Sequence, residues 1–445
     1  MINVYQEYKK KLKTPDEAVK IVKDGDWVDY STVVCAPQLL DEALARRKDE
    51  LHGVNIRGNL GFGPVQVAEQ DPSREHFYYN TWHCSGYERH LIDRGLCNFI
   101  PMLFRNLTSY YKRFLTVNVA MMCVPPMDDK GFFNLSCGTG VARDILRVAD
   151  YVILEVNEHM PVVYGAYDDH IHISDVDCVV EGKHEPLHEV PAPPATEDDI
   201  KIADYILPYI KNGDTLQLGI GGMPNVLGKR IAESDLKDLG MHTELCSDGY
   251  YDLYEAGKLT NERKKIYPGK GVTGIIFGSK KLYEWADHNQ GILSAPLSFV
   301  NSPATVRQID DMVSINNCIS VDLYGQIAAE TAGGRHISGT GGQLDFLTGA
   351  YAAENGRGFI CLTSTFTDKQ GQVHSRIQPN FCGEIVTDPR AQAYYIVTEQ
   401  GIVNLAGRTT WERAERIISI AHPDFREDLI KEAEKMKIWR KTNKK

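Results

Sequence analysis

Two stretches of the chain decide the fold: DGDWVDYSTVVCAPQLLDEALARRKDEL (residues 24–51) and NGDTLQLGIGGMPNVLGKRIAESDLKDL (residues 212–239). Each begins with a Gly-Asp turn, continues as a short apolar segment and passes through a loop of small residues that ends in proline (Pro37 and Pro224). Each then continues with apolar residues at helical spacing. The order strand, loop, helix is typical of βαβ units with a largely parallel sheet. Its recurrence predicts an α/β protein built from two tandem related domains, each with a parallel sheet flanked by helices.

Two further pairs of segments support a duplication. DDKGFFNLS (128–136) and TDKQGQVHS (367–375) both resemble β-hairpins with glycine in the turn. ADYVILEVNEHMPVVYG (149–165) and AQAYYIVTEQGIVNLAG (391–407) both read as a strand followed by a turn. The three pairs occur in the same order in both halves, which favours duplication over chance similarity.

The clearest break in composition is EGKHEPLHEVPAPPATEDD (181–199), where Pro, Glu and His replace apolar periodicity. This segment is typical of an inter-domain linker. We therefore predict an N-terminal domain over residues 1–190 and a C-terminal domain over residues 191–445. Further segments predict strands at 273–278, 358–366 and 394–400, and helices at 35–51, 224–239 and 410–419.

Composition excludes several classes of function. Among the 445 residues, 49 Lys and Arg face 60 Asp and Glu, a formal charge of −11 that disfavours binding to nucleic acid. No stretch approaches the ~20 apolar residues that span a bilayer, and MINVYQEYKKKLK at the start has no apolar segment behind its lysines. We expect a cytoplasmic protein. Its ten cysteines form no CxxC pair, so they are expected to be free and mostly buried rather than zinc ligands or a redox dithiol.

Glycine-rich loops are the first candidate binding elements. QLGIGGMPNVLG (217–228) lies between a predicted strand and a helix, where bare backbone N–H groups and the helix dipole favour a phosphate. It lacks the Lys-Ser/Thr of a P-loop, and a tight packing turn is the alternative interpretation. GGRHISGTGGQLDFLTGA (333–350) offers backbone donors at Gly339, Gly341 and Gly342 that can form an oxyanion hole, unless the segment is simply a flexible loop.

Glu244 is a candidate nucleophile. It lies in MHTELCSDGYYDLYEAGKLT (241–260), where TEL reads as a strand end and SDG as the following turn. A carboxylate inside an apolar strand is costly unless it is paired or used. Exposure to solvent or a salt bridge is the alternative, and His242 on the same face is expected to be structural.

A metal site is the weaker interpretation of the histidines. His170 and His172 near Asp168 and Asp169, and His184 with His188 in the linker, lie in acidic, loop-like surroundings without regular ligand spacing. We predict no metal.

Six motifs together resemble the family I CoA-transferases, in the 4-hydroxybutyrate and butyryl-CoA:acetate branch. They are QLGIGGMP (217–224), HTELCSDG (242–249), FVNSPATV (299–306), SGTGGQLDF (338–346), GQVHSRIQP (371–379) and TEQGIVNLAGRT (398–409). The resemblance covers essentially the whole chain and implies the CoA-transferase fold, a homo-oligomer (dimer or tetramer), and coenzyme A as substrate with no permanently bound cofactor. It also implies that the N-terminal domain contributes to an acyl pocket and that the C-terminal domain binds CoA and carries the catalytic glutamate.

The same resemblance assigns individual residues. It implies that Glu244 is the covalent carrier and that Gly342 supplies an N–H to the thioester oxygen. It implies CoA contacts for Gly219, Ile220, Gly221, Gly222, Met223, Asn301, Gly341, Gly342 and Lys369. One departure is that the family's (S/G)ENG around the glutamate reads TELCSDG here.

The expected reaction is ping-pong transfer of CoA between butyryl-CoA and acetate, without ATP or metal. NLGFGP (59–64) and FYYNTWHCSGYERH (77–90) are candidates to line the acyl pocket, although most of these aromatics suit core packing. Lys264 and Lys265 are candidate phosphate contacts. The alternatives are 4-hydroxybutyrate or propionate as substrate, an acyl-CoA hydrolase on the same fold, or a noncatalytic CoA- or nucleotide-sensing protein. A dehydrogenase is disfavoured because the acidic ribose-binding residue is missing.

Overall fold

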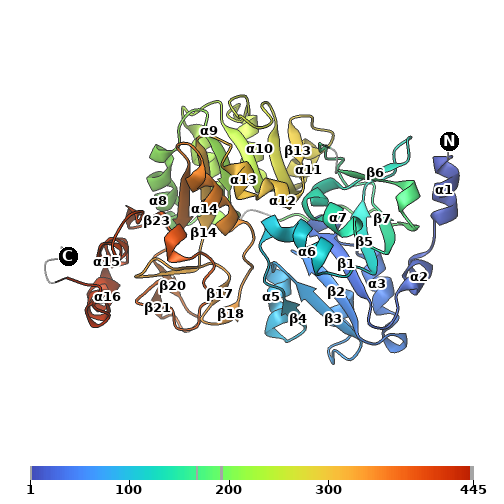
Figure 1. Cartoon of the computed structure of the whole chain (residues 1–445), viewed down its shortest axis with the longest axis horizontal. Helices are drawn as coiled ribbons and strands as arrows, with labels where there is room; N and C mark the ends of the chain where they lie inside the picture. The colour runs from blue at the N-terminus through green and yellow to red at the C-terminus, as the bar shows by residue number, and fades with distance from the viewer. Residues whose placement is uncertain (1–2, 167–168, 191–193, 441–445) are drawn as a thin grey trace. The chain divides into compact units, whose positions relative to one another are not determined.

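The computed structural model describes residues 3–166, 169–190 and 194–440 and forms two compact units (Figure 1). The first comprises Met1–Pro191, Glu244–Ser247 and Gly271–Val300, and the second comprises Ala192–Thr243, Asp248–Lys270 and Asn301–Lys445. The chain therefore returns to the first unit twice after residue 191. The domain boundary inferred from the linker-like composition, between residues 190 and 191, stays a prediction.

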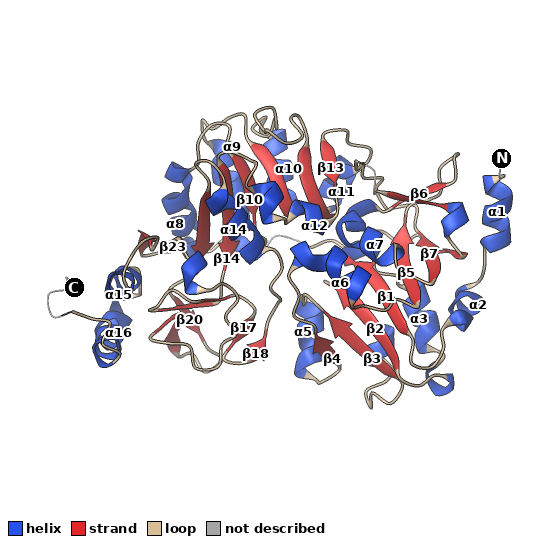
Figure 2. Ribbon diagram, viewed as in Figure 1, coloured by secondary structure: helices blue, strands red, loops and turns tan. Residues whose placement is uncertain are grey.

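The first unit is built on a seven-stranded sheet in the order β4-β3-β2-β1-β5-β7-β9, and every pairing in it is parallel. Helices cover the sheet (Figure 2). Its strands are β1 Trp27–Thr32, β2 Val54–Asn59, β3 Phe77–Thr81, β4 Cys97–Phe99, β5 Val119–Val124, β7 Tyr151–Val156 and β9 Cys178–Glu181. Its helices before residue 191 are α1 Val4–Lys11, α2 Pro15–Ala18, α3 Leu39–Ala45, α4 Gln66–Glu69, α5 Gly86–Asp93, α6 Leu107–Arg113 and α7 Thr139–Leu146. Later parts of the chain add two strands and two helices to this unit: β12 Gly271–Ile276, α11 Lys280–Ala286, β13 Ile292–Ser294 and α12 Leu297–Val300.

A second sheet has eight strands in the order β13-β12-β11-β10-β14-β19-β23-β24. Among its described pairings, only that of β23 with β24 is antiparallel. The strands that lie wholly in the second unit are β10 Thr215–Leu218, β14 Met312–Asn317, β19 Arg357–Cys361, β23 Tyr395–Thr398 and β24 Gly401–Asn404. Strand β11 Gly240–Cys246 is divided after Thr243, and its last three residues belong to the first unit. Its helices are α8 Glu197–Ile206, α9 Gly222–Glu233, α10 Asp248–Glu255, α13 Pro303–Val306, α14 Gln343–Ala352, α15 Thr410–Ser419 and α16 Pro423–Lys435.

Short strands complete both units. In the first unit β6 Phe132–Asn134 pairs with β8 His170–His172. In the second unit β15 Ser320–Asp322 pairs with β16 Ile327–Ala328 and β22 Ile377–Gln378, β17 Thr331–Ala332 pairs with β18 Arg335–His336, and β20 Thr365–Thr367 pairs with β21 Val373–Ser375.

The strand orders confirm the duplicated α/β architecture. The run β4-β3-β2-β1-β5-β7 has the same chain order as β13-β12-β11-β10-β14-β19. By position the counterpart of β7 is thus β19, so the pairing of segments 149–165 and 391–407 was wrong: it matched β7 with β23, one strand farther out. A short apolar strand followed by a turn has the same local pattern wherever it lies in a parallel sheet, which is why the sequence could not separate them.

The two segments predicted as hairpins have the same type of turn, but only one of them forms a two-stranded hairpin. Asp128 accepts hydrogen bonds from the N–H groups of residues 130 and 132, and Asp368 accepts from those of residues 370 and 372, all at 2.8–2.9 Å. A glycine at positive φ, Gly131 or Gly371, completes each turn. The hairpin at 367–375 is confirmed by the β20–β21 pairing, whereas β6 pairs with the distant β8.

The predicted helices are placed correctly but differ in length. The 35–51 prediction shortens to α3, and the 224–239 prediction becomes α9, which starts two residues earlier and ends at Glu233. The 410–419 helix is confirmed as α15, where Thr409 and Glu412 exchange hydrogen bonds in a capping box.

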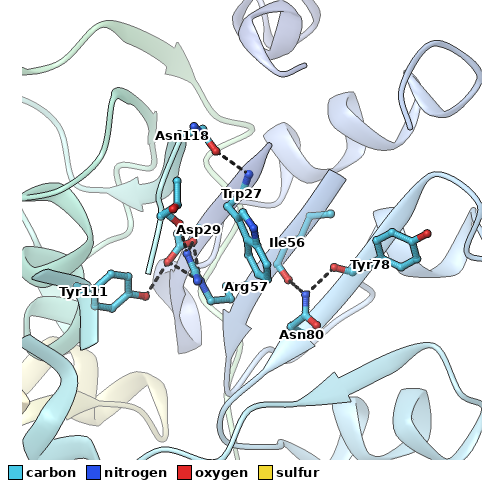
Figure 3. A network of polar contacts seen from close by, with 9 residues as sticks. Trp27, Asp29, Ile56, Arg57, Tyr78, Asn80, Tyr111 and Asn118 are labelled. Atoms are coloured by element: carbon cyan, nitrogen blue, oxygen red, sulfur yellow. Dashed lines mark hydrogen bonds and ion pairs between the residues drawn. The ribbon is translucent and has the colours of Figure 1, made fainter. Parts of the chain in front are cut away.

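A buried ion pair ties the first sheet to α6 (Figure 3). Asp29 and Arg57 face each other in register on β1 and β2, with Arg57 Nη2 2.7 Å from Asp29 Oδ1 and both side chains buried. The Tyr111 hydroxyl donates to Asp29 Oδ2 at 2.6 Å, and the guanidinium lies 4.6 Å from the Trp27 ring centroid. Burial raises the pKa of Asp29 while the Arg57 charge opposes that shift.

All ten cysteines lie in the described residues and are free, as predicted. Eight are buried, Cys318 is half-buried and Cys382 is exposed. Within the part of the chain that the structure describes, no helix is both long and apolar enough to cross a membrane.

Candidate active site

The first glycine loop connects β10 to α9, as predicted. Gly221 has φ +120°, a conformation that favours glycine, and it caps α9 without a side chain to accept hydrogen bonds from the helix N–H groups. A Cβ on Gly222 would lie 2.9 Å from Asp199 Oδ2. Ile220 is 46% exposed, whereas Met223 is buried. The loop therefore presents bare backbone and one apolar side chain at the start of a twelve-residue helix, an arrangement suited to an anion with an apolar neighbour.

Glu244 lies two residues before the carboxyl end of β11, which is a parallel neighbour of β10. It is the half-buried residue of a strand whose other six residues are buried. Its backbone carbonyl accepts a hydrogen bond from Thr273 Oγ1 at 3.4 Å. His242 is completely buried, and its ring centroid lies 6.2 Å from that of Phe346, as expected for a structural residue. Glu244 therefore lies near the carboxyl end of its strand, and open α/β proteins bind ligands beyond the carboxyl ends of their strands.

Three side-chain hydrogen bonds connect the second glycine segment to neighbouring parts of the second unit. The Ser338 hydroxyl donates to Ala329 O at 2.9 Å, Thr340 Oγ1 to Glu330 Oε2 at 3.1 Å, and Gln343 Nε2 to Asp388 Oδ2 at 2.5 Å. Burial raises the pKa of Asp388 to about 7 and also raises that of Glu330. Gly341 has φ +54°, and Gly342 is the buried N-cap of α14.

The remaining predicted contacts lie on different elements of the second unit. Asn301 is completely buried just before α13. Lys369 is exposed at the tip of the β20–β21 hairpin, whose turn is held by Asp368. Glu244 belongs to the first compact unit, and the predicted CoA contacts belong to the second.

Lys264 is not a phosphate contact, contrary to the sequence-based expectation. Its side chain is 4% exposed, and Nζ donates to Met241 O at 2.8 Å and to Lys270 O at 2.6 Å. Burial lowers its pKa to about 7. It ties the first residues of β11 to the segment before β12. Lys265 is exposed and forms a 2.5 Å ion pair with Asp310.

The candidate metal residues do not converge. Asp169 binds His170 Nδ1 at 2.7 Å, His172 binds the Ser174 hydroxyl, and the His188 ring stacks on Phe62. Asp168 lies outside the described residues. Nowhere in residues 3–166, 169–190 and 194–440 do three potential metal ligands form a group.

The first unit contains a cavity of about 90 Å³ at the carboxyl ends of β1, β2, β5 and β7. It is lined by five residues of NLGFGP, namely Asn59, Gly61, Phe62, Gly63 and Pro64, together with Tyr79 from the aromatic segment. Of the other large aromatics of that segment, Phe77 and Trp82 are buried, whereas Tyr78 and Tyr87 are half-buried.

Two buried carboxyl groups of this cavity were missed at the sequence level. The Asp41 carboxylate accepts hydrogen bonds from the Tyr30 hydroxyl and from the backbone N–H groups of residues 66 and 67. Glu155 Oε2 accepts from Leu39 N at 3.0 Å and Leu40 N at 3.1 Å. Burial raises the pKa of Asp41 to about 7 and also raises that of Glu155. Glu155 is an acid in the apolar strand YVILEV, the same signal that singled out Glu244.

Comparison with known proteins now defines the class. Residues 1–191 match the acetyl-CoA hydrolase/transferase N-terminal domain, and residues 278–433 match the C-terminal domain of that name. The chain belongs to the acetyl-CoA hydrolase/transferase family. This membership confirms the predicted kinship with CoA-transferases and the predicted fold.

Individual relatives align over nearly the full length. The butyryl-CoA:acetate CoA-transferase of Anaerostipes caccae is 50% identical over 442 residues, with 99% of each chain covered. The 4-hydroxybutyrate coenzyme A transferase of Clostridium kluyveri is 36% identical, with 96% of this chain and 98% of the relative covered. The crystal structure of RipA from Yersinia pestis is 35% identical, has a TM-score of 0.91 and covers 98% of this chain and 100% of its own.

Proposed function

We propose that the protein is an acyl-CoA:carboxylate CoA-transferase that uses butyryl-CoA and acetate. The observation that carries the proposal is the 50% identity to a butyryl-CoA:acetate CoA-transferase over 442 residues. Glu244 near the carboxyl end of β11 is the carboxylate to which the proposal assigns the chemistry. In this proposal CoA is a substrate, and no cofactor stays bound. We also propose that the enzyme acts in the cytoplasm as a homo-oligomer, a dimer or a tetramer.

Glu244 is the proposed nucleophile. Its carboxylate attacks the thioester carbonyl of butyryl-CoA, giving a glutamyl–butyryl anhydride and CoA thiolate. The thiolate then attacks the glutamyl carbonyl, butyrate leaves, and a glutamyl-CoA thioester remains on the enzyme. Acetate repeats these steps in reverse and departs as acetyl-CoA. The energy of the thioester is conserved throughout, so the reaction requires no ATP.

The glycine segments have distinct proposed roles. The backbone of Gly219–Met223 packs against CoA, and Asn301 and Gly341 contribute further contacts. The N–H of Gly342 donates to the oxygen that becomes negative when the thioester carbonyl is attacked, an interaction worth roughly 2.7–4 kcal/mol per donor. The hydrogen bonds of Ser338, Thr340 and Gln343 support this role because they hold the segment in one geometry before substrate binds.

Lys369 is proposed to contact a CoA phosphate. The hairpin that bears it borders a cavity of about 600 Å³ within the second unit, lined among others by Ile319, Phe366 and Arg376. The Arg376 guanidinium carbon lies 5.1 Å from the Phe366 ring centroid. A cation, an aromatic face and apolar side chains suit the nucleotide part of CoA, which supports a site beside Lys369.

Incubation with butyryl-CoA in the absence of acetate tests the mechanism. We expect mass spectrometry to detect a CoA adduct on the peptide that contains Glu244, and acetate to discharge it. Absence of the adduct would refute the covalent route. Thioester loss that is equally fast with and without acetate would instead indicate an acyl-CoA hydrolase.

A further inference from the structure

The two glycines that precede α14 lie between two residues whose side chains are hydrogen-bonded to acids. Thr340 comes directly before the pair, and its hydroxyl donates to Glu330 Oε2 at 3.1 Å. Gln343 comes directly after it as the first residue of α14, and its Nε2 donates to Asp388 Oδ2 at 2.5 Å. The glycines have no side chains of their own, so these flanking contacts restrain the direction of the Gly342 N–H.

The backbone of Asp388 is anchored independently of its side chain. Its N–H donates to Ile327 O at 3.2 Å, and its carbonyl oxygen accepts from Ile327 N at 3.2 Å. The two residues thereby form an antiparallel bridge, and Ile327 is the first residue of β16. Asp388 therefore connects the β15–β16 pair to the start of α14 through its carboxyl group. All of these residues belong to the second compact unit.

The surroundings of the Asp388 carboxyl group favour its neutral form. The residue is completely buried, and among the described residues Oδ1 has no hydrogen-bond partner. The titratable groups around it are Glu330 after β16, Asp345 in α14 and the Cys318 thiol before β15, and none of these is a cation. Burial, aided by the two acids, raises the pKa of Asp388 to about 7. An ionised carboxylate with one uncharged donor would be costly here.

The charge of Asp388 bears on the proposed chemistry. Attack on a thioester places negative charge on its oxygen, which the Gly342 N–H at the start of α14 is proposed to stabilise. The start of a helix contributes a partial positive charge to such a site. An ionised Asp388, bonded to the first residue of α14, would offset that contribution and oppose the oxyanion. The neutral acid keeps the hydrogen bond from Gln343 without this repulsion.

We propose that Asp388 is a positioning residue for the oxyanion donor Gly342. In its neutral form it holds Gln343, and its ionisation slows CoA transfer by placing negative charge at the start of α14. This inference rests on the proposed CoA-transferase function. It adds a control of the reaction by pH, located in a residue that acts through Gln343 rather than on the substrate.

Steady-state turnover of butyryl-CoA and acetate as a function of pH tests the inference. We expect wild-type kcat to fall by about tenfold between about pH 6 and about pH 8.5, with KM for butyryl-CoA changed by less than about twofold, because the oxyanion forms only in the transition state. Asp388→Asn keeps an oxygen for Gln343 and cannot ionise. It should stay within about threefold of wild type at the lower pH and abolish the decline.

Removal of the contact tests the positioning role. Asp388→Ala takes away the acceptor of Gln343 and should lower kcat by about tenfold at every pH, the scale of one hydrogen bond. Gln343→Ala should have the same effect, and the double variant should lose no more than either single variant, because all three remove one contact. Thermal melting establishes that each variant is folded. If Asp388→Ala does not fold, Gln343→Ala and Asp388→Asn decide the outcome.

Asp322→Asn is the matched control. Asp322 is also a completely buried aspartate of the second unit, burial raises its pKa, and its Oδ2 accepts from Gln326 Nε2 at 2.6 Å. It holds the turn between β15 and β16 instead of the glycine segment, so this variant should keep the wild-type pH profile.

Three results would overturn the inference in an active enzyme: a wild type without the decline, a decline that Asp388→Asn retains, or a decline that Asp322→Asn also abolishes. Additive losses in Asp388→Ala and Gln343→Ala would overturn the positioning role. A wild type that transfers no CoA at any pH would instead refute the proposed function, and the inference with it.

Discussion

The two halves of the duplication use the same helix start in opposite ways. In the first half, the N–H groups of Leu39 and Leu40 at the start of α3 bind the carboxylate of Glu155. In the second half, α9 starts at Gly221, which has no side chain to offer. One helix start is satisfied from within the protein, while the other presents backbone suited to an external anion. A single acidic side chain thus occupies, in one copy, a helix start that the other copy leaves without a side-chain partner.

The strand registers extend the comparison to the proposed nucleophile. Trp27 and Thr215 each follow a Gly-Asp pair, and they face Asn55 and Gly240 on the next strands. Counting four residues onward places Asn59 in the first half at the position that Glu244 has in the second. The first half therefore has an amide where the second has a carboxylate, so chemistry is expected from one copy only.

The largest expected effect comes from removing that carboxylate. Glu244→Gln should lower kcat by at least roughly 10³-fold, because an amide cannot form the acyl intermediate. Adding Asn59→Glu to this variant should not restore turnover. Steady-state kinetics and thermal melting together check both variants. Restored activity in a folded double variant would contradict the prediction that only the second half can carry the reactive carboxylate.

The second expected effect concerns the stability of the first sheet. Arg57→Met leaves Asp29 buried without its counter-charge and should cost about 3–5 kcal/mol of unfolding free energy. Asp29→Leu combined with Arg57→Met should recover most of that loss. By register the counterparts of this pair in the second half are Gln217 and His242. Gln217→Leu should cost less, because no isolated charge remains. Urea denaturation measures all three, and equal losses would contradict the prediction.

A smaller effect is expected at the glycine loop. Gly222→Ala puts a Cβ 2.9 Å from Asp199 Oδ2 and should raise KM for acyl-CoA by about tenfold through displacement of the start of α9. Gly25→Ala is the control in the first half, since Gly25 has φ +77° and no atom within 4 Å of the added Cβ. It should cost about 1–2 kcal/mol of stability and leave KM unchanged. A rise in KM for both variants would indicate a general loss of structure.

The smallest effect concerns Glu155. Burial raises its pKa above the ordinary 4.5, so the folded protein binds more protons than the unfolded chain, and stability declines as pH rises from about 4.5 through the folded pKa. Glu155→Gln keeps an oxygen for Leu39 and Leu40, should change stability by about 1 kcal/mol or less, and should flatten this decline. Melting temperatures at pH 5 and pH 8 test it; an unchanged slope would show that Glu155 does not titrate in this range.

The sequence predicted the elements that repeat and could not predict how side chains pair across them. The Gly-Asp, strand, loop, helix pattern located β1, β10, α3 and α9 because it depends on local periodicity and turn chemistry. The local pattern also led to the wrong assignment of β23 as the counterpart of β7 in the second half, because the position of a strand in a sheet depends on long-range pairing.

The same limit applies to the candidate site. Lys264 looked like a surface cation in a basic segment, yet the fold turns it inward onto two backbone carbonyls. Asp388 carried no signal at all, because its burial and its contact with Gln343 emerge only when distant segments of the second unit come together. Glu244 could be singled out as a candidate because a carboxylate within an apolar strand is unusual in the sequence alone, and its role as the nucleophile stays a prediction.

The distribution of cysteines has a practical consequence. Burial raises the pKa of the Cys35, Cys123 and Cys361 thiols, which keeps them protonated and out of reach of electrophiles. Cys382 alone among the ten is exposed. A maleimide dye or spin label added under native conditions should therefore attach at one known point of the second unit, which gives the protein a built-in reporter position without any engineered cysteine.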